Sequence, residues 1–377
     1  MNKIITPNQI KENNRKLIFD YIYKNSGVSQ QDIAYNLRFS RPTVAANLEA
    51  LENSGLIQKS GQIDTEFVGR KAAAYAIVPD FRVSIGVEIS EEEIKMTAVN
   101  LYGEQIDCHV YDIPYENEEA YFEVVCEKIL EFKGFLSITD EQLLGIGFAM
   151  QALISPDKNK VLYGEILSCT GLSIEVFTRR LPYPCSFIRD ADSAAISEIW
   201  ASPELKDAFY LSLGWHFGAA IISNREILTG KHGHSSTVEH IQGRSSGPLC
   251  YCGKRGCIET LCSLTALLAE DESPETFFEA LRQQDLSILK RWNRFLLDLA
   301  EIINMLHMVF DTDFILGGYL SLYLCEEDIS VLYDRIRQLT PFAETQDFIL
   351  ISKMTKNSIA AGAALLYIQA FLNELPC

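Results

Sequence analysis

The chain has 377 residues, of which 47% are hydrophobic and 22% are charged, and its formal net charge at pH 7 is −18. This composition is that of an ordinary soluble globular protein, and the length predicts two or three domains rather than one core. Because an acidic surface repels phosphate, any contact with nucleic acid must come from a local patch.

The charge is unevenly distributed along the chain. Residues 1–80 contain 10 Lys and Arg against 8 Asp and Glu, whereas the remaining residues contain 23 against 43. This asymmetry predicts a domain boundary near Pro79 and assigns any DNA contact to the first domain. No apolar run reaches the ~18 residues that span a bilayer, and residues 1–14 lack a signal-peptide core. We therefore expect a cytoplasmic protein without membrane contact.

Three helices and two strands are predicted in the first domain. Apolar residues at helical spacing indicate a helix over residues 14–24. A Ser-x-x-Asp capping box predicts a short helix over residues 30–37, and Ser40 is expected to cap a third helix over residues 41–53. Two strands follow, joined by a polar loop: residues 56–58 and 72–78.

This order of elements is typical of a winged helix-turn-helix, whose second motif helix enters the major groove. Arginine pairs with guanine and asparagine with adenine, and basic wing residues contact phosphate or the minor groove. The candidates for DNA contact lie on one face of the third helix and in the wing: Arg41, Thr43, Asn47, Arg70 and Lys71. Small helical units also mediate protein contacts, so a solvated charged face is the alternative.

From residue 83 onward, strands alternate with helices, which indicates an α/β fold with a mixed sheet. The first expected elements are strands over residues 83–89, 94–100 and 144–148 and a helix over residues 118–132. A similar opening recurs at residues 208–223. Two related halves predict two lobes with a ligand cleft between them.

The densest cluster of metal-binding residue types lies at residues 250–257. Cys250, Cys252 and Cys257 are interleaved with two glycines, and His240 lies ten positions upstream. Three thiolates and one imidazole form a complete tetrahedral set for zinc, which predicts a structural rather than a catalytic ion. A disulfide or four unrelated buried residues are the alternatives.

These residues resemble the ROK family, a group of bacterial sugar-responsive repressors and sugar kinases. The family's zinc motif, a His followed by Cys-x-Cys-Gly-x-x-Gly-Cys-x-Glu, is matched by His240 and residues 250–259. Its Asn-Asp-Ala-Asn segment is matched by residues 189–192, and its late Gly-Gly turn by residues 317–318. Its closing Ala-Gly-Ala-Ala helix is matched by residues 361–364.

The resemblance implies an N-terminal winged helix-turn-helix (residues 1–80) followed by a two-lobed actin-like ATPase domain of the ROK type (residues 81–377). Lobe one is expected to cover about residues 81–190 together with the C-terminal helix, and lobe two about residues 191–355. The winged helix is similar to that of the family's repressor branch.

Both phosphate loops depart from the pattern of the family's kinases. The first, Asp-x-Gly-Gly-Thr, is replaced by residues 88–92, which carry three carboxylates and no glycine. The second, Gly-Thr-Gly-x-Gly-Gly, is replaced by residues 214–219, where Trp215 and Phe217 are expected to fill the nucleotide space. Phosphate binding needs small residues and free backbone N–H groups, so the sequence predicts a protein that is not an enzyme.

The sugar side of the family's site is partly retained. The resemblance implies an effector site formed by Arg189, Asp190, Thr237, His240 and Glu259. Arg189 and Thr237 replace an asparagine and a glutamate of the family, which makes the site less acidic. Three possibilities remain at this point: a negatively charged sugar derivative, an altered neutral sugar, or no ligand because Arg189 pairs with Asp190 or Asp192.

The sequence therefore predicts a DNA-binding transcriptional regulator, a repressor of carbohydrate metabolism genes, with a double-stranded DNA operator and a sugar or sugar derivative as partners. Structural Zn²⁺ is the expected cofactor, held by His240, Cys250, Cys252 and Cys257. A homodimer or homotetramer is expected because symmetric operators match symmetric proteins. The alternative is a sugar kinase of the same family.

Overall fold

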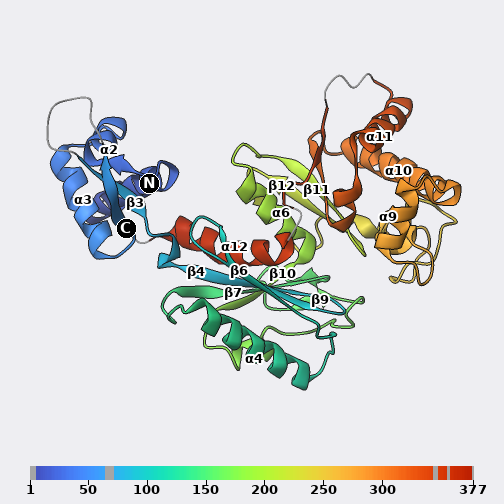
Figure 1. Cartoon of the computed structure of the whole chain (residues 1–377), viewed down its shortest axis with the longest axis horizontal. Helices are drawn as coiled ribbons and strands as arrows, with labels where there is room; N and C mark the ends of the chain where they lie inside the picture. Colours follow the sequence, from blue (N-terminus) through green and yellow to red (C-terminus); the bar gives the residue numbers. More distant parts are fainter. Residues whose placement is uncertain (1–5, 64–71, 343–346, 355–356, 376–377) are drawn as a thin grey trace.

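The computed structural model describes residues 6–63, 72–342, 347–354 and 357–375. The N-terminal domain lies at one end of the molecule, and two larger lobes follow it (Figure 1). The predicted wing residues Arg70 and Lys71 lie outside the described residues. Within the described ranges, no helix combines the length and the hydropathy needed to cross a bilayer.

The N-terminal domain packs three helices against a small antiparallel sheet of order β1-β3-β2. Its elements are α1 (Pro7–Lys24), β1 (Val28–Ser29), α2 (Gln30–Asn36), α3 (Arg41–Asn53), β2 (Ile57–Ile63) and β3 (Ala72–Ile77). The capping oxygens lie as predicted, because Ser29 accepts the N–H of Asp32 at 3.1 Å and Ser40 accepts that of Thr43 at 3.2 Å. The helix-turn-helix prediction is confirmed.

Two boundaries in this domain differ from the prediction. The first helix begins at Pro7 and not at residue 14, because Thr6 and Gln9 form a capping box at its N-terminal end. Strand β2 continues to Ile63 through residues predicted as loop, with a bulge between Lys59 and Gly61. Polar residues on an exposed edge give no apolar alternation, so the periodicity could not reveal this part of the strand.

Lobe one is built on a five-stranded sheet of order β10-β7-β4-β5-β6. Strands β10, β7 and β4 are parallel, while β5 and β6 continue β4 as antiparallel neighbours. Helices α4 and α12 cover its two faces (Figure 1). The elements are β4 (Val83–Ile89), β5 (Ile94–Val99), β6 (Gln105–Tyr111), α4 (Glu119–Leu136), β7 (Leu143–Met150), β8 (Leu153–Ile154), β9 (Val161–Tyr163), α5 (Glu175–Thr178), β10 (Cys185–Arg189) and α12 (Ser358–Glu374).

Lobe two repeats this topology with a sheet of order β13-β12-β11-β14-β15, in which the first strand is again central and its hairpin neighbours lie on one side. Its strands are β11 (Ala208–Leu213), β12 (Phe217–Ser223), β13 (Glu226–Ile227), β14 (Asp313–Gly317) and β15 (Ile349–Ile351). The covering helices are α7 (Glu259–Cys262), α8 (Leu264–Leu267), α9 (Pro274–Arg282), α10 (Leu286–His307) and α11 (Glu326–Leu339). The repeated strand order confirms the expectation of two related halves.

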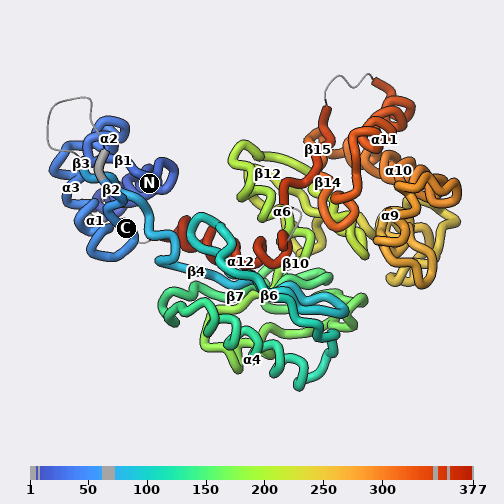
Figure 2. The backbone as a smooth tube through the Cα atoms, viewed as in Figure 1, coloured from blue at the N-terminus to red at the C-terminus, as the bar shows by residue number. Residues whose placement is uncertain are grey.

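Helices α6 (Asp190–Ala201) and α12 hold the two lobes together. The hydroxyls of Ser193 and Ser197 donate to the carbonyls of Ile359 and Ser358 at 2.5 and 2.6 Å. The chain returns from lobe two through α12, which ends beside the N-terminal domain (Figure 2), where Lys16 Nζ donates to the carbonyl of Leu372 at 2.6 Å. One helix thus contacts both lobes and the first domain.

The close packing of α12 on β4 depends on glycine. A Cβ atom at Gly86 would collide with the backbone carbonyl of Ala360, which cannot move without displacing the helix. Gly86→Ala is therefore expected to destabilise the protein by about 1–3 kcal/mol, as overpacked cores do. A matched control is Gly134→Ala on α4, where nothing lies within 4 Å and alanine should stabilise by ~0.5 kcal/mol. Urea unfolding of both variants measures the difference, and equal midpoints would contradict the packing argument.

Candidate functional site

The four predicted metal ligands lie together at one side of lobe two. His240 ends a short 3₁₀ helix (Val238–His240), and the three cysteines lie on the loop that follows. The Cys250 sulfur lies 3.7 Å from His240 Nδ1, and the Cys252 and Cys257 sulfurs lie 3.7 Å apart. All four ligand atoms lie within 4.8 Å of one another.

These separations fit a tetrahedral metal and not a disulfide. Ligands bonded at about 2.3 Å to a tetrahedral zinc are roughly 3.8 Å apart, whereas bonded sulfurs are about 2.05 Å apart. Burial lowers the pKa of His240, which favours the neutral imidazole that a metal requires. The cysteines are free thiols, so the donor set is complete and chemically suited to zinc.

Glycine makes the tight path of this loop possible. Gly253 and Gly256 have φ angles of +82° and +72°, values that other residues adopt at a cost. A Cβ at Gly256 would also collide with the carbonyl of Arg244. The N–H of Cys250 donates to the carbonyl of Lys254 at 2.8 Å, which closes the turn that carries the thiols.

A small cavity of about 40 Å³ lies between the lobes beside the metal cluster. Three of the five predicted effector residues line it, namely Arg189, Asp190 and His240. Thr237 does not; its hydroxyl donates to the carbonyl of His234 at 3.1 Å. Glu259 is also absent from the lining. Thr237 and Glu259 thus lie outside the lining of this cavity, and their role in effector binding stays a prediction.

The Glu259 carboxylate is held by the second phosphate-loop segment instead. One oxygen lies 2.8 Å from His216 Nδ1, and the other accepts the backbone N–H of Phe217 at 2.7 Å. The Phe217 ring is buried in the lobe-two core, and Trp215 is 53% exposed. The expectation that both rings fill a nucleotide space was therefore wrong for Phe217, whose strand directs it into the core.

The two segments that stand at the positions of the family's phosphate loops contact each other. His216 Nε2 lies 3.8 Å from the Glu91 carboxylate, which follows β4 in lobe one. Burial acts to lower the pKa of His216, but Glu259, Glu91 and Asp190 outweigh it and raise that pKa above its ordinary value. Carboxylates and a histidine occupy the loops that would otherwise present backbone N–H groups to phosphate.

Arg189 does not present a free positive charge to the cavity. Its guanidinium donates to Asp192 and to the carbonyl of Ala219, both at 2.6 Å, and to the carbonyl of Ser235 at 3.1 Å. Asp192 thus neutralises it, whereas Asp190 is stabilised by a hydrogen bond from the backbone N–H of Ala191 and by the charges of Arg189 and His216. The cavity is less cationic than the sequence suggested.

Sequence reasoning missed one acidic residue, Glu239. It lines the cavity, is buried, and its Oε2 has no hydrogen-bond partner among the described residues. Burial raises its pKa to about 7. The sequence does contain a signal, because Glu239 is a carboxylate only two positions after Thr237, where the family has its glutamate. Alignment with the family motif places Glu239 at a glycine position, so it was not predicted.

Asp190 provides a test of the cavity's electrostatics. Burial raises its pKa to about 6, whereas an unfolded aspartate titrates near 3.9. Between these values the folded protein keeps a proton that the unfolded chain has released, so stability falls as pH rises through that window.

Asp190→Asn is therefore expected to be more stable than the wild type by about 1–3 kcal/mol at pH 8 and equal to it near pH 4. Urea unfolding at both pH values measures this. Asp157→Asn is the control, because hydrogen bonds to Asp157 lower its pKa and its removal should give no gain at pH 8. A gain that does not change with pH would contradict the assignment.

The recognition helix presents fewer of the predicted residues than expected. Arg41 is exposed, Thr43 is half-buried with its hydroxyl 2.7 Å from that of Ser40, and Asn47 is buried at 3% exposure. The Asn47 amide donates to the carbonyl of Thr43 at 2.8 Å. Asn47 as a base contact was therefore wrong. The exposed face also carries Ala45, Ala46 and Glu49, which were not predicted.

The chain is similar in sequence and in structure to known proteins. A model described as the ROK family matches residues 84–370, and one described as winged helix-turn-helix DNA-binding matches residues 11–58. The DNA-binding transcriptional dual regulator NagC of Escherichia coli K12 is 24% identical over a segment that covers 68% of this chain but only 64%, less than two thirds, of the regulator. The xylose repressor of Caldicellulosiruptor bescii is 21% identical and covers 97% of both chains. A solved ROK family transcriptional regulator, a homologue of the Escherichia coli MLC protein, superposes with a TM-score of 0.77 at 20% identity over 97% of each chain.

Proposed function

The chain belongs to the ROK family, and from this premise we propose that it is a DNA-binding transcriptional regulator, a repressor of carbohydrate-utilisation genes controlled by a sugar or sugar derivative. One observation carries the proposal: a winged helix-turn-helix precedes a ROK domain whose two phosphate loops are tied to each other by Glu91 and His216. Similarity to the NagC regulator and the xylose repressor supports it.

The proposed DNA contact is the exposed face of α3. Arg41 lies at the N-terminal end of this helix, where residues of a recognition helix reach base edges. The small side chains of Ala45 and Ala46 allow the helix to approach the groove closely. Two such helices on a symmetric dimer, or on a tetramer built from dimers, would read two half-sites one helical turn apart.

Selection of binding sites from a random DNA pool with the full-length chain tests this proposal. We expect a palindrome with half-site centres about 10 base pairs apart, or a multiple of one helical turn. Binding should also weaken steeply with salt, because phosphate contacts release counterions. Recovery of unselected sequences at every round would argue against a sequence-specific regulator.

We propose structural zinc for the cluster of His240, Cys250, Cys252 and Cys257. When bound, zinc would supply a rigid anchor and no open coordination position. His240, whose Nδ1 lies 3.7 Å from the Cys250 sulfur, would be one of the ligands, and a bound metal would fix the orientation of its ring. The metal would thus hold one wall of the effector site in place.

The proposed effector is a neutral polyhydroxylated sugar. Asp190 and Glu239 offer acceptors for hydroxyl groups, and both have pKa values raised by burial. Arg189, which favoured an anionic ligand, is already paired with Asp192. The cavity of about 40 Å³ holds only a few waters, so its walls would have to move apart to admit a sugar, and separation of the lobes would achieve this. Binding would therefore favour a more open arrangement.

Isothermal titration with neutral and phosphorylated sugars distinguishes these ligand classes. Binding of a neutral sugar that is weakened by Asp190→Ala is the expected result, and heat with phosphorylated sugars alone would reverse the assignment. The kinase alternative makes a separate prediction, which is ADP release in the presence of that sugar and Mg-ATP. Turnover above the sugar-free background would favour the kinase.

A further inference from the structure

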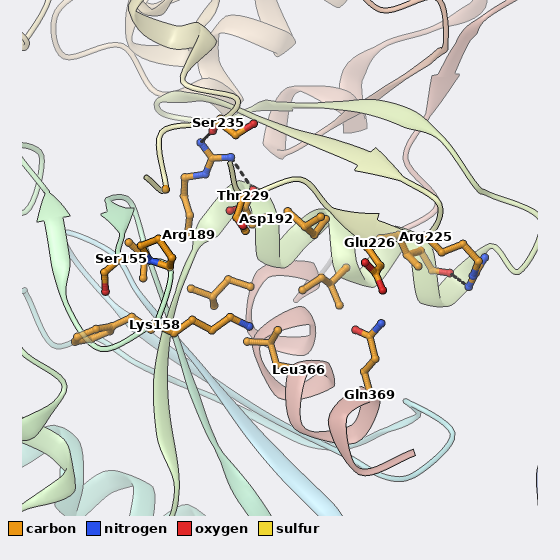
Figure 3. Close-up of a pocket in the computed structure, with 18 of the residues that line it drawn as sticks. Ser155, Lys158, Arg189, Asp192, Arg225, Glu226, Thr229, Ser235, Leu366 and Gln369 are labelled. Carbon is orange, nitrogen blue, oxygen red and sulfur yellow. Dashed lines mark hydrogen bonds and ion pairs between the residues drawn. The ribbon is translucent and has the colours of Figure 1, made fainter. Parts of the chain in front are cut away.

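A second and larger cavity, of about 370 Å³, opens where α6 and α12 meet both lobes (Figure 3). Its walls are mostly apolar: Phe187, Ile188, Ile196, Ile199, Trp200 and Leu366. Arg189 lines this cavity and the small one beside the metal cluster, so the two are neighbours. A volume of this size is typical of sites for small organic ligands, which are about 300–1,000 Å³.

One cation in this cavity has no partner. The amine of Lys158 points into the space toward Leu366 of α12 (Figure 3), and in the part of the chain that the structure describes it makes no hydrogen bond or ion pair. Burial lowers the pKa of Lys158, against the opposing charge of Asp192. An ammonium group desolvated without a counter-ion costs free energy unless an anion joins it.

The backbone fixes Lys158 in this position. Lys158 has a φ angle of +60°, in the left-handed region, which is unusual for a residue other than glycine. Its N–H donates to the carbonyl of Ser155 at 2.8 Å, and its own carbonyl accepts the N–H of Phe187 at 2.8 Å. The turn is therefore anchored to β10, and the amine is directed by a strained residue rather than by a mobile loop.

The other charged groups of the cavity are paired, bonded to backbone carbonyls or exposed, although Arg189 Nε has no hydrogen-bond partner among the described residues. Arg189 is paired with Asp192. The Arg225 guanidinium donates to backbone carbonyls at the end of α6, including those of Ile199 and Ser202 at 2.8 and 2.9 Å. Glu226 is exposed to solvent. Among the described residues that line the cavity, Lys158 is thus the cation whose charged group forms no hydrogen bond or ion pair.

We propose that this cavity is a second ligand site, which binds a small amphipathic anion with an aromatic or branched apolar body and one carboxylate, sulfonate or phosphate group. The apolar walls would cover the body, and Lys158 would pair with the anion. Gln369 and Thr229 also line the cavity and offer further hydrogen-bonding groups. This ligand differs from the proposed sugar effector in charge and polarity, and its binding does not depend on the DNA-binding proposal.

The site is connected to the N-terminal domain by direct contacts. The indole N–H of Trp200, in the cavity wall, donates to the carbonyl of Tyr102 at 2.6 Å. The Tyr102 ring stacks on Tyr23 of α1 with centroids 4.9 Å apart. Helix α12 lines the cavity at Leu366 and binds Lys16 through the carbonyl of Leu372. A ligand here would be placed to influence how the first domain is held.

Fluorescence titration of the full-length chain with 1-anilinonaphthalene-8-sulfonate, an aromatic sulfonate of suitable size, tests the site. We expect saturable binding that Lys158→Met weakens at least tenfold, because methionine keeps the apolar stem and removes the charge. Lys160→Met is the matched control, since Lys160 lies on the same loop but is exposed, and it should bind as the wild type does. The neutral analogue N-phenyl-1-naphthylamine should bind the wild type and Lys158→Met equally.

Ile199→Trp, which fills the cavity from α6, should remove binding of both probes while the melting temperature shows that the protein still folds. If Ile199→Trp does not fold, the comparison of Lys158→Met with Lys160→Met decides alone. Equal affinity of wild type and Lys158→Met for the sulfonate would overturn the proposal. So would unchanged binding of either probe to a folded Ile199→Trp protein.

Discussion

Replacing Cys257 with serine is expected to abolish metal binding and to destabilise the loop of lobe two that carries it. Cys257 is fully buried, and its sulfur lies 3.7 Å from that of Cys252. A serine hydroxyl cannot replace a thiolate as a zinc ligand. Structural zinc contributes about 10 kcal/mol or more of apparent binding energy in zinc-finger peptides. We therefore expect the free energy of unfolding to fall by several kcal/mol, even though the metal would stabilise only lobe two.

Zinc content after exhaustive dialysis and the urea unfolding midpoint measure this effect. The wild type should hold about one zinc per chain, and Cys257→Ser close to none. Cys325→Ser is the matched control, because Cys325 is an exposed thiol outside the cluster, and it should keep both the metal and the stability. Because His240 borders the small cavity, Cys257→Ser should also lose sugar binding. Retained zinc or normal sugar binding in this variant would contradict the proposed role of the metal.

Replacing Arg41 with glutamate is expected to reduce specific DNA binding by at least 100-fold. A bidentate arginine–base contact contributes about 1–3 kcal/mol, and a carboxylate facing phosphate adds repulsion of roughly 1 kcal/mol per close pair. Arg41 is exposed at the N-terminal end of α3, so the change should alter DNA affinity and leave folding intact.

Arg179→Glu is the control for the change in net charge, because Arg179 is an exposed arginine of lobe one, at the end of α5. It should alter operator affinity by less than about threefold, since exposed charges this far away are screened. Fluorescence anisotropy with a selected site and with random DNA measures both variants. If Arg41→Glu and Arg179→Glu weaken binding equally, α3 is not the element that recognises the DNA sequence.

Local signals in the sequence predicted the helices of the first domain well. The capping serines and the cysteine spacing depend on neighbours within a few residues, so the sequence alone contains the information. Asn47 shows the opposite case. Positions 44, 47, 48 and 51 follow the spacing of a buried helical face, and all four are buried. The periodicity therefore indicates burial of Asn47, whereas the base preference of asparagine favours exposure to the DNA groove.

The candidate site was predicted less completely because its contacts join distant segments. Glu259 is hydrogen-bonded by His216, 43 residues earlier in the chain, and does not line the cavity itself. Arg189 is neutralised by Asp192, one of the alternatives that the sequence left open. The cavity beside Lys158 is lined by residues of both lobes and of α12. No local sequence pattern predicts that such distant segments meet.

Direct contacts connect the proposed effector site to the first domain. Helix α6 begins at Asp190 in the small cavity and carries Trp200, which contacts Tyr102. Tyr102 stacks on Tyr23 of the first domain. A change in lobe separation that moves α6 would therefore reach α1, and a sugar that prefers the open arrangement would shift the equilibrium between DNA-binding states.

The most direct test is operator binding by the full-length chain, measured by fluorescence anisotropy on its own upstream region with and without the sugar identified by titration. We predict tight, salt-dependent binding that the sugar weakens at least tenfold in the absence of ATP, which corresponds to a coupling of about 1.4 kcal/mol. Binding no tighter than to random DNA, or release that requires ATP hydrolysis, would contradict the account.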